Sequence, residues 1–257
     1  MRISLVQSGL VWENIDANLR TFSEKLAPLA GKTDMVVLPE MFTTGFTMKA
    51  AELAEDMDGL AVNWMSKTAS LLGSAVVGSF ICKEHGLHKN RLVFMFPDGH
   101  FEYYDKRHLF TLAGEHEVFS PGTRKLTIEW KGFRICPMIC YDLRFPVWSR
   151  NQSGAAAYDL LLYVANWPSR RGLHWRSLLQ ARAIENQSYV VGVNVVGRDG
   201  NDLEYSGDSC IIDFSGQHLV SLTASEAVVT VSVSLPELHD FRTRLPFLND
   251  ADQFLIK

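Results

Sequence analysis

The chain has 257 residues, of which 47% are hydrophobic and 21% charged, and its formal net charge is -4. This composition is typical of a globular protein with a sizeable core, and the length fits one large domain or two small ones. There is no block of Lys and Arg residues and no apolar run of roughly 18 residues, so we expect neither nucleic-acid binding nor a membrane span.

The N-terminal half alternates short apolar runs with helical patterns. In "NIDANLRTFSEKLAPLA" the apolar residues recur at the three- and four-residue spacing of an amphipathic helix. A second helical pattern ends at Gly73, a residue type that commonly ends helices. In chain order, the pattern predicts a strand at 3–9, a helix at 14–30, a strand at 34–40, a helix at 61–73 and a strand at 74–82.

The C-terminal half adds hairpins to this alternation. In chain order, we predict a hairpin at 91–106, a hairpin at 125–140, a strand at 159–168, a helix at 174–187, a strand at 188–197, a hairpin at 209–222 and a strand at 227–235. From about Pro236 onward we expect a peripheral helix and tail. Helices interspersed among strands predict a layered α/β fold, and the absence of a linker or repeat predicts a single domain over 1–257.

The cysteines are expected to be free thiols, because a reducing compartment argues against disulfides. The four cysteines are Cys82, Cys136, Cys140 and Cys210, and three of them lie within apolar stretches typical of inert core thiols. No second Cys or His pair has zinc-finger spacing, so we expect no metal and no disulfide. Glu13 interrupts the N-terminal apolar stretch too early for a signal peptide. We therefore predict a cytoplasmic protein.

Three predicted strands end in a residue that can carry chemistry: Glu40, Lys106 and Cys140. A base, a cation and a thiol suit covalent catalysis, and strand ends are where sites collect in α/β folds. The segment after Cys140 is expected to open a helix whose N–H groups favour negative charge. Each residue also has an ordinary structural role open to it. Cys140 suits a core position, Glu40 a helix cap, Lys106 a charged surface, and Glu115 a solvated loop.

The segments "VVLPEMFTTGF", "YYDKRHLF" and "CYDLRFPVWSR" together resemble motifs of the nitrilase, or carbon–nitrogen hydrolase, superfamily. The resemblance extends from Ile3 to about Ser234, in the family's order. "DKRHLF", "CYDLRFPVWSR" and "NWP" are similar to the omega-amidase branch, whose members hydrolyse the terminal amide of 2-oxo acid amides. The resemblance implies a four-layer αββα sandwich, often paired as a homodimer, that uses no cofactor.

The resemblance also implies a role for each matching residue. Glu40 is expected to be the general base and later acid, Lys106 to stabilise the tetrahedral intermediate, and Cys140 to be the nucleophile. The backbone N–H of Tyr141 is the expected second oxyanion donor. A further family glutamate matches Glu115 best, with Glu117 as the alternative. Asp142 and Arg144 are expected to brace the bend after the cysteine.

A substrate with a distal carboxylate needs a cation, and a guanidinium matches a carboxylate best. The loop "NWPSRRGLHW" contains Arg170 and Arg171, and we favour Arg171 as the clamp; a solvated basic loop is the competing interpretation. Phe42 and Trp167 are predicted to wall the pocket, and Asn166 to orient either the substrate or the loop.

Other functions remain open at the level of sequence. A carbamoyl-amide hydrolase or a general aliphatic amidase would use the same three residues. An acyltransferase or synthetase would need extra membrane helices or a fused domain, which this sequence does not contain. A non-catalytic scaffold is the remaining alternative.

Overall fold

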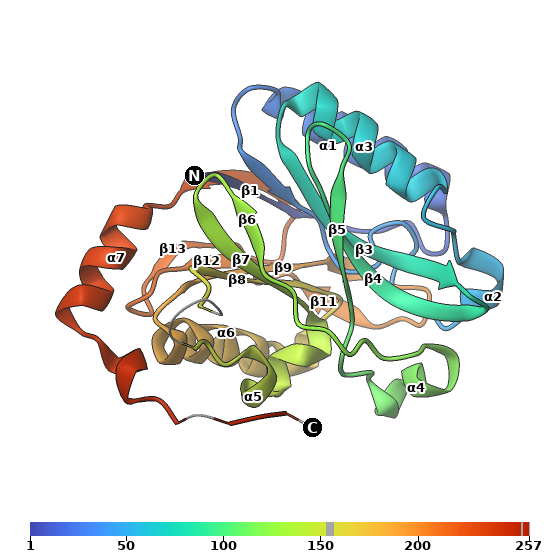
Figure 1. Cartoon of the computed structure of the whole chain (residues 1–257). Coiled ribbons are helices and arrows are strands. Elements are labelled where there is room, and N and C mark those ends of the chain that lie inside the picture. Colours follow the sequence, from blue (N-terminus) through green and yellow to red (C-terminus); the bar gives the residue numbers. More distant parts are fainter. Residues whose placement is uncertain (153–156, 253, 257) are drawn as a thin grey trace.

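The computed structural model describes residues 1–152, 157–252 and 254–256. Two six-stranded sheets form its centre (Figure 1). The first sheet has the order β14 (Ala227–Ser232), β1 (Arg2–Gln7), β2 (Met35–Val37), β3 (Ala75–Glu84), β4 (Leu87–Met95) and β5 (Phe101–Asp105). The second has the order β13 (His218–Ser221), β12 (Cys210–Ile212), β9 (Tyr189–Asn194), β8 (Leu160–Ala165), β7 (Phe133–Ile139) and β6 (Ile128–Trp130).

The two sheets share one plan. In each, three central strands run parallel, β1–β2–β3 in the first and β7–β8–β9 in the second, and the flanking strands are antiparallel. Parallel strands point their carboxyl ends the same way, so β2 and β7 deliver the residues that follow them to defined edges. A separate hairpin consists of β10 (Val196–Arg198) and β11 (Glu204–Ser206).

Helices cover the outer faces of both sheets (Figure 1). The first sheet is covered by α1 (Ile15–Leu26) and α3 (Leu60–Leu72), and the second by α6 (Gly172–Asn186). The shorter helices are α2 (Ala50–Leu53), α4 (Glu115–Val118) and α5 (Pro146–Ser149), and α7 (Leu235–Arg244) lies to the side. The layers are therefore helix, sheet, sheet and helix, as the resemblance implied.

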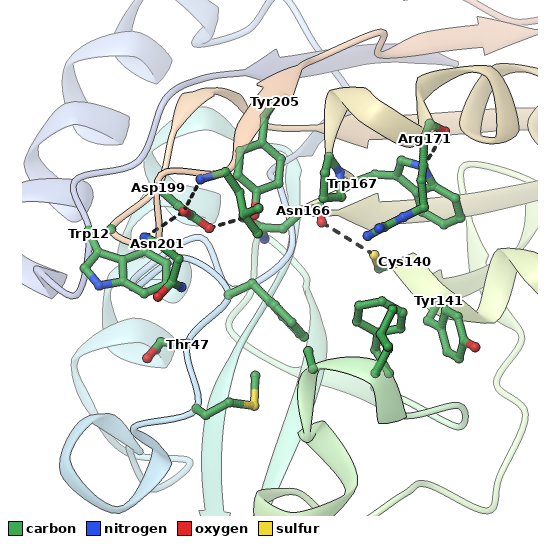
Figure 2. A pocket seen from close by; sticks show the side chains of 18 of the residues that line it. Trp12, Thr47, Cys140, Tyr141, Asn166, Trp167, Arg171, Asp199, Asn201 and Tyr205 are labelled. Atoms are coloured by element: carbon green, nitrogen blue, oxygen red, sulfur yellow. Dashed lines mark hydrogen bonds between the residues drawn. The ribbon is translucent and has the colours of Figure 1, made fainter.

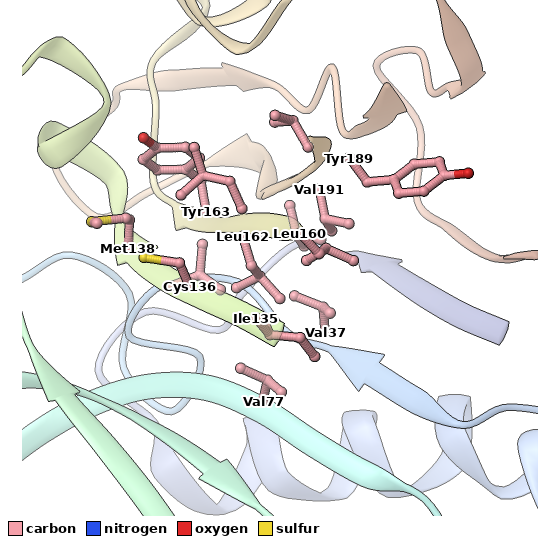
Figure 3. Packing of buried hydrophobic residues seen from close by; sticks show 14 of the residues in the cluster. Val37, Val77, Ile135, Cys136, Met138, Leu160, Leu162, Tyr163, Tyr189 and Val191 are labelled. Carbon is pink, nitrogen blue, oxygen red and sulfur yellow. The ribbon is translucent and has the colours of Figure 1, made fainter. Parts of the chain in front are cut away.

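Alternate residues of each strand build two different parts of the core. On β1, Ile3 and Leu5 belong to the cluster between the sheets, whereas Val6 packs with Phe22 of α1. Figure 3 shows part of the cluster to which Ile3 and Leu5 belong, with Val37 of β2 facing Ile135 of the second sheet. Because both faces of these strands are covered, their sequences read as continuous apolar runs.

The structure differs from the predicted elements in three places. β3 continues to Glu84 and β4 starts at Leu87, with a left-handed turn between them, because the exposed end of this hairpin is polar and falls outside the apolar run. The predicted strand 188–197 is divided between β9 and β10. The expected helix after Cys140 is a 3-10 turn, Cys140–Arg144, followed by the four-residue α5, so no long helix points its N-terminus at the cysteine.

Across the described ranges, no helix is both long and apolar enough to cross a membrane. Within the same residues, no group of three or more His, Cys, Asp or Glu side chains is arranged to hold a metal ion.

Candidate active site

Glu40 lies just beyond the end of β2 and is fully buried. Its Oε1 accepts hydrogen bonds from Nζ of Lys106 at 2.9 Å and from Nδ2 of Asn90 at 2.8 Å. Its Oε2 accepts one from the backbone N–H of Asn166 at 2.8 Å. These donors compensate the desolvation of the carboxylate and determine its orientation. At Met41 the chain turns through a left-handed conformation, with φ of 45°, which is uncommon for a residue with a side chain.

Lys106 follows β5 directly, and its side chain is inaccessible to solvent. Nζ donates to Glu40 at 2.9 Å and to the two oxygens of Glu115 at 2.9 and 3.0 Å. Burial disfavours the ammonium, but the carboxylates of Glu115 and Glu40 outweigh it and raise the pKa of Lys106 above its ordinary value. Burial raises the pKa of Glu115, against the opposing effect of Lys106. Glu115 is thus the glutamate that reaches Lys106, whereas Glu117 is exposed.

Cys140 occupies the sharp bend after β7, with φ of 42°, another left-handed conformation. Its sulfur lies 4.0 Å from the carbonyl oxygen of Asn166, and the residue as a whole is half-buried at the edge of the cavity. Burial raises the pKa of the Cys140 thiol well above its ordinary value, and the neighbouring carboxylate of Glu40 raises it further. Cys140 is therefore a neutral thiol at rest, and a base must take its proton before the sulfur can attack.

Asp142 braces this bend, as expected. Its buried carboxylate accepts hydrogen bonds from the backbone N–H of Ile139 at 3.1 Å and from the backbone N–H of His108 at 2.9 Å. The hydroxyl of Tyr104 donates to it at 2.8 Å and in turn accepts from Nε1 of Trp148 at 2.9 Å. These contacts tie the bend to the segment that carries Lys106.

A cavity of about 590 Å³ opens beside Cys140 (Figure 2). Its lining includes Lys106 and three arginines, Arg144, Arg170 and Arg171. Arg144, expected to brace the bend, instead lies over the ring of Trp167, with Cζ 4.6 Å from the ring centroid. In the part of the chain that the structure describes, none of the three forms an ion pair with a carboxylate. Burial and the neighbouring guanidiniums lower the pKa of Arg171, so an entering anion would relieve an unfavourable concentration of positive charge.

Comparison with known proteins identifies the family. The family described as carbon–nitrogen hydrolase matches residues 2–243. The chain belongs to the carbon–nitrogen hydrolase family. It is 45% identical to omega-amidase YafV of Escherichia coli over 99% of this chain and 98% of that protein. It is 34% identical to 2-oxoglutaramate amidase of Bacillus subtilis over 96% of each. A CN-hydrolase superfamily protein of Xanthomonas campestris, solved with an arsenic adduct in its active site, has a TM-score of 0.98 and 46% identity, covering 100% of this chain and 99% of that chain.

In this carbon–nitrogen hydrolase Phe42 does not wall the cavity, contrary to the prediction. Phe42 is fully buried under α1 and α3, with its ring centroid 5.8 Å from that of Phe22 and 5.6 Å from that of Trp64. The left-handed turn at the preceding residue directs the ring away from the cavity. Phe46 lines the cavity instead, with Nζ of Lys106 5.0 Å from its ring centroid.

The other predicted binding residues line the cavity: Tyr141, Asn166, Trp167, Arg170 and Arg171. Nδ2 of Asn166 donates to the backbone carbonyl of Glu40, so this amide orients the loop. Nε1 of Trp167 donates to the backbone carbonyl of Arg171 at 2.8 Å and holds the arginine loop in place. Arg171 is partly buried, whereas Arg170 is exposed.

The opposite wall of the cavity was not predicted from the sequence. The tip between β10 and β11 contributes Asp199 and Asn201, β11 contributes Tyr205, and Trp12 lies beside the tip (Figure 2). Asp199 organises the tip by accepting from the Tyr205 hydroxyl at 2.8 Å and from the backbone N–H groups of Asn201 and Leu203 at 2.8 and 3.0 Å. The sequence signal for this wall was the run "RDGND", which predicts a turn but does not indicate which residues the turn contacts.

Proposed function

We propose that this carbon–nitrogen hydrolase is an omega-amidase, which hydrolyses the terminal amide of 2-oxo acid amides to the acid and ammonia. The substrate class comprises 2-oxoglutaramate, 2-oxosuccinamate and their methylthio analogue. One observation carries the proposal: a thiol, a carboxylate and an ammonium meet beside a cavity lined by guanidiniums that have no acidic partner among the residues that the structure describes. Full-length similarity to an omega-amidase and to a 2-oxoglutaramate amidase supports the choice of substrate.

In the proposed first half-reaction, Glu40 takes the proton of the Cys140 thiol, and the sulfur attacks the amide carbon. Lys106 and the backbone N–H of Tyr141 stabilise the oxyanion of the tetrahedral intermediate, a contribution whose loss typically lowers the rate by about a hundredfold or more. The carbon–nitrogen bond then breaks. Glu40 returns its proton to the leaving nitrogen, so ammonia departs and a thioester with Cys140 remains.

In the second half-reaction, water attacks the thioester carbon while Glu40 accepts one of its protons. The tetrahedral intermediate again places its oxyanion at Lys106. The carbon–sulfur bond breaks, the sulfur recovers a proton from Glu40, and the carboxylic acid product leaves. One water is consumed for each ammonia released, and the Glu–Lys–Cys triad returns to its starting state.

For the substrate carboxylate we propose Arg171 as the principal partner. The guanidinium is partly buried and lacks an acidic partner among the described residues, so a carboxylate can bind it bidentately without displacing another ion pair. Arg144 flanks the same part of the cavity, and the more exposed Arg170 is the alternative.

We extend the proposal to a cytoplasmic homodimer with a single catalytic domain. Four free cysteines suit a reducing compartment. Pairing through the outer helix layer is supported by apolar side chains that α5 and α6 leave exposed, namely Val147, Leu173 and Ile184.

The decisive experiment measures ammonia released from 2-oxoglutaramate by the wild type and by Cys140→Ala. We expect the variant to lose activity by about 10³-fold or more, because no other group can form the thioester. Cys210→Ala is the matched control, since it removes a buried thiol at a distance from the cavity and should retain activity.

The alternatives have distinct outcomes in the same assay. Equal activity of wild type and Cys140→Ala would contradict the thiol mechanism. Hydrolysis of carbamoyl or simple aliphatic amides in preference to 2-oxo acid amides would favour another carbon–nitrogen hydrolase. An inactive wild type across all of these substrates would favour a scaffold.

A further inference from the structure

Asn90 on β4 contacts three of the four ionisable residues of the site. Its backbone carbonyl accepts from the backbone N–H of Lys106 at 3.0 Å. Its Nδ2 donates to Oε1 of Glu40 at 2.8 Å and approaches Oε1 of Glu115 at 3.5 Å. Asn90 is fully buried and was not a candidate in the sequence analysis. Asn90 thus fixes the backbone position of Lys106 and holds the side chain of Glu40, the proposed base.

The orientation of this amide follows from charge. With the amide reversed, the side-chain oxygen of Asn90 would face the oxygens of both carboxylates, which repel it. With the amide as it stands, Oδ1 is buried and has no hydrogen-bond donor among the residues that the structure describes. A buried acceptor without a partner is destabilising, and an apolar side chain would avoid that cost. What the asparagine offers in return is its Nδ2 donor, which is used on the buried carboxylate of Glu40, so its presence here is tied to that carboxylate.

The charged neighbours of Asn90 come from three elements. Glu40 follows β2, Glu115 lies on α4 and Lys106 follows β5. The residue of β3 that pairs with Asn90 is the apolar Ile81. When the ammonium of Lys106 turns toward an oxyanion, its hydrogen bond to Glu40 weakens. The uncharged Nδ2 of Asn90 is then the side-chain donor that continues to hold Oε1 of Glu40.

We infer that Asn90 is a positioning residue of the reaction: its side-chain N–H group holds the Glu40 carboxylate facing the Cys140 thiol while Lys106 serves the oxyanion. The inference rests on the proposed function, because it concerns the same thiol chemistry. It predicts that Asn90 acts on proton removal from the sulfur and has little effect on substrate binding.

Two variants test this role. Asn90→Leu keeps a similar volume but removes the donor, and should lower kcat roughly 10- to 100-fold with KM changed less than about threefold, the effect of losing a hydrogen bond to a charged group. Asn90→Asp keeps the shape and donates only while protonated. Its activity relative to wild type should therefore fall as pH rises, whereas that of Asn90→Leu should stay low throughout.

A second readout is independent of the substrate. The rate of alkylation of Cys140 by iodoacetamide, followed by mass spectrometry of the intact protein, should fall in Asn90→Leu and show the same pH-dependent loss in Asn90→Asp. Asn151→Leu is the matched control: Asn151 is equally buried, bonded to Asn186 and Tyr158, and should affect thermal stability but not alkylation.

Each outcome decides the matter. Wild-type kcat and alkylation in both Asn90 variants would overturn the inference. So would losses in Asn90→Leu and Asn90→Asp that are equal at all pH values and follow the loss of folded protein, since a merely structural residue would behave that way. If wild type fails on every 2-oxo acid amide but the alkylation differences appear, the proposed substrate is wrong and the role of Asn90 stands.

Discussion

The residues around Cys140 determine the state of its sulfur. Glu40 and Glu115 both accept hydrogen bonds from Nζ of Lys106, so two carboxylates share one ammonium. Burial disfavours a thiolate at Cys140, and the neighbouring carboxylates disfavour it further, so the pKa of this thiol is well above its ordinary value. Transferring the proton from sulfur to Glu40 leaves the total charge unchanged, and the low-polarity surroundings tolerate that step better than loss of the proton to solvent.

A single guanidinium is expected to account for the preference for acidic amides. Arg171→Ala should raise KM for 2-oxoglutaramate roughly 10- to 100-fold, because a charge-assisted hydrogen bond is lost, while kinetics on a neutral amide of similar length should change little. Arg171→Lys should recover part of the loss, since an ammonium cannot bind a carboxylate bidentately. Arg170→Ala tests the alternative partner, and Arg20→Ala, an exposed arginine on α1 outside the cavity lining, is the control. If Arg171→Ala leaves the ratio of KM for acidic and neutral amides unchanged, Arg171 does not bind the substrate carboxylate.

At the scale of elements, strand ends and the loops between them deliver the reactive groups. Glu40 follows β2, Lys106 follows β5 and Cys140 follows β7, so both sheets contribute to one site. The loop after α4 holds the backbone of Lys106 in place. The backbone N–H of Gly122 donates to the carbonyl of Lys106 at 2.8 Å, and a Cβ at Gly122 would lie 2.1 Å from the carbonyl oxygen of Asp105. Only a residue without a side chain allows this approach.

Gly122→Ala should therefore displace the backbone that carries Lys106. We expect a loss of stability of about 1–3 kcal/mol, typical of overpacking, together with a lower kcat per folded molecule. Urea denaturation and steady-state kinetics on the same preparation would measure both. Gly9→Ala is the control, because its added Cβ would make only ordinary contacts, the nearest at 3.4 Å. Wild-type stability and kcat in Gly122→Ala would contradict this account.

At the scale of the whole molecule, three thiols besides that of Cys140 are buried in the core. Burial raises the pKa of Cys82 to about 11 and those of Cys136 and Cys210 to about 12, above the ordinary value of 9.0. In the unfolded chain these thiols ionise near that ordinary value. Between about pH 9 and about pH 11 the folded state therefore keeps protons that the unfolded state has lost, and the free energy of unfolding falls as pH rises.

Each buried thiol should lower the free energy of unfolding by roughly 1 kcal/mol between about pH 8 and about pH 10. Urea titrations at several pH values would compare wild type with Cys210→Ala. The variant should start less stable near neutral pH, because it leaves a small cavity, but should lose less stability on going alkaline. Parallel declines in the two proteins would show that the buried thiols are not the cause.

The amino-acid sequence by itself determined most of the strands and helices, the α/β class, and the residues that end the strands, among them Glu40, Lys106 and Cys140. These features depend on residues close together in the chain. Apolar periodicity reports which faces a segment buries, and a polar residue at the end of an apolar run marks where the strand stops.

Only the tertiary structure decided which of these residues meet. The contacts of Glu40 join residues 50, 66 and 126 positions apart, to Asn90, Lys106 and Asn166 respectively, and no local pattern encodes such pairs. Phe42 and Phe46 are four residues apart in one motif, yet the turn that contains the left-handed residues Met41 and Gly45 places one in the core and the other in the cavity. The reason is physical: burial patterns are local, whereas a site is the sum of distances set by how two sheets pack.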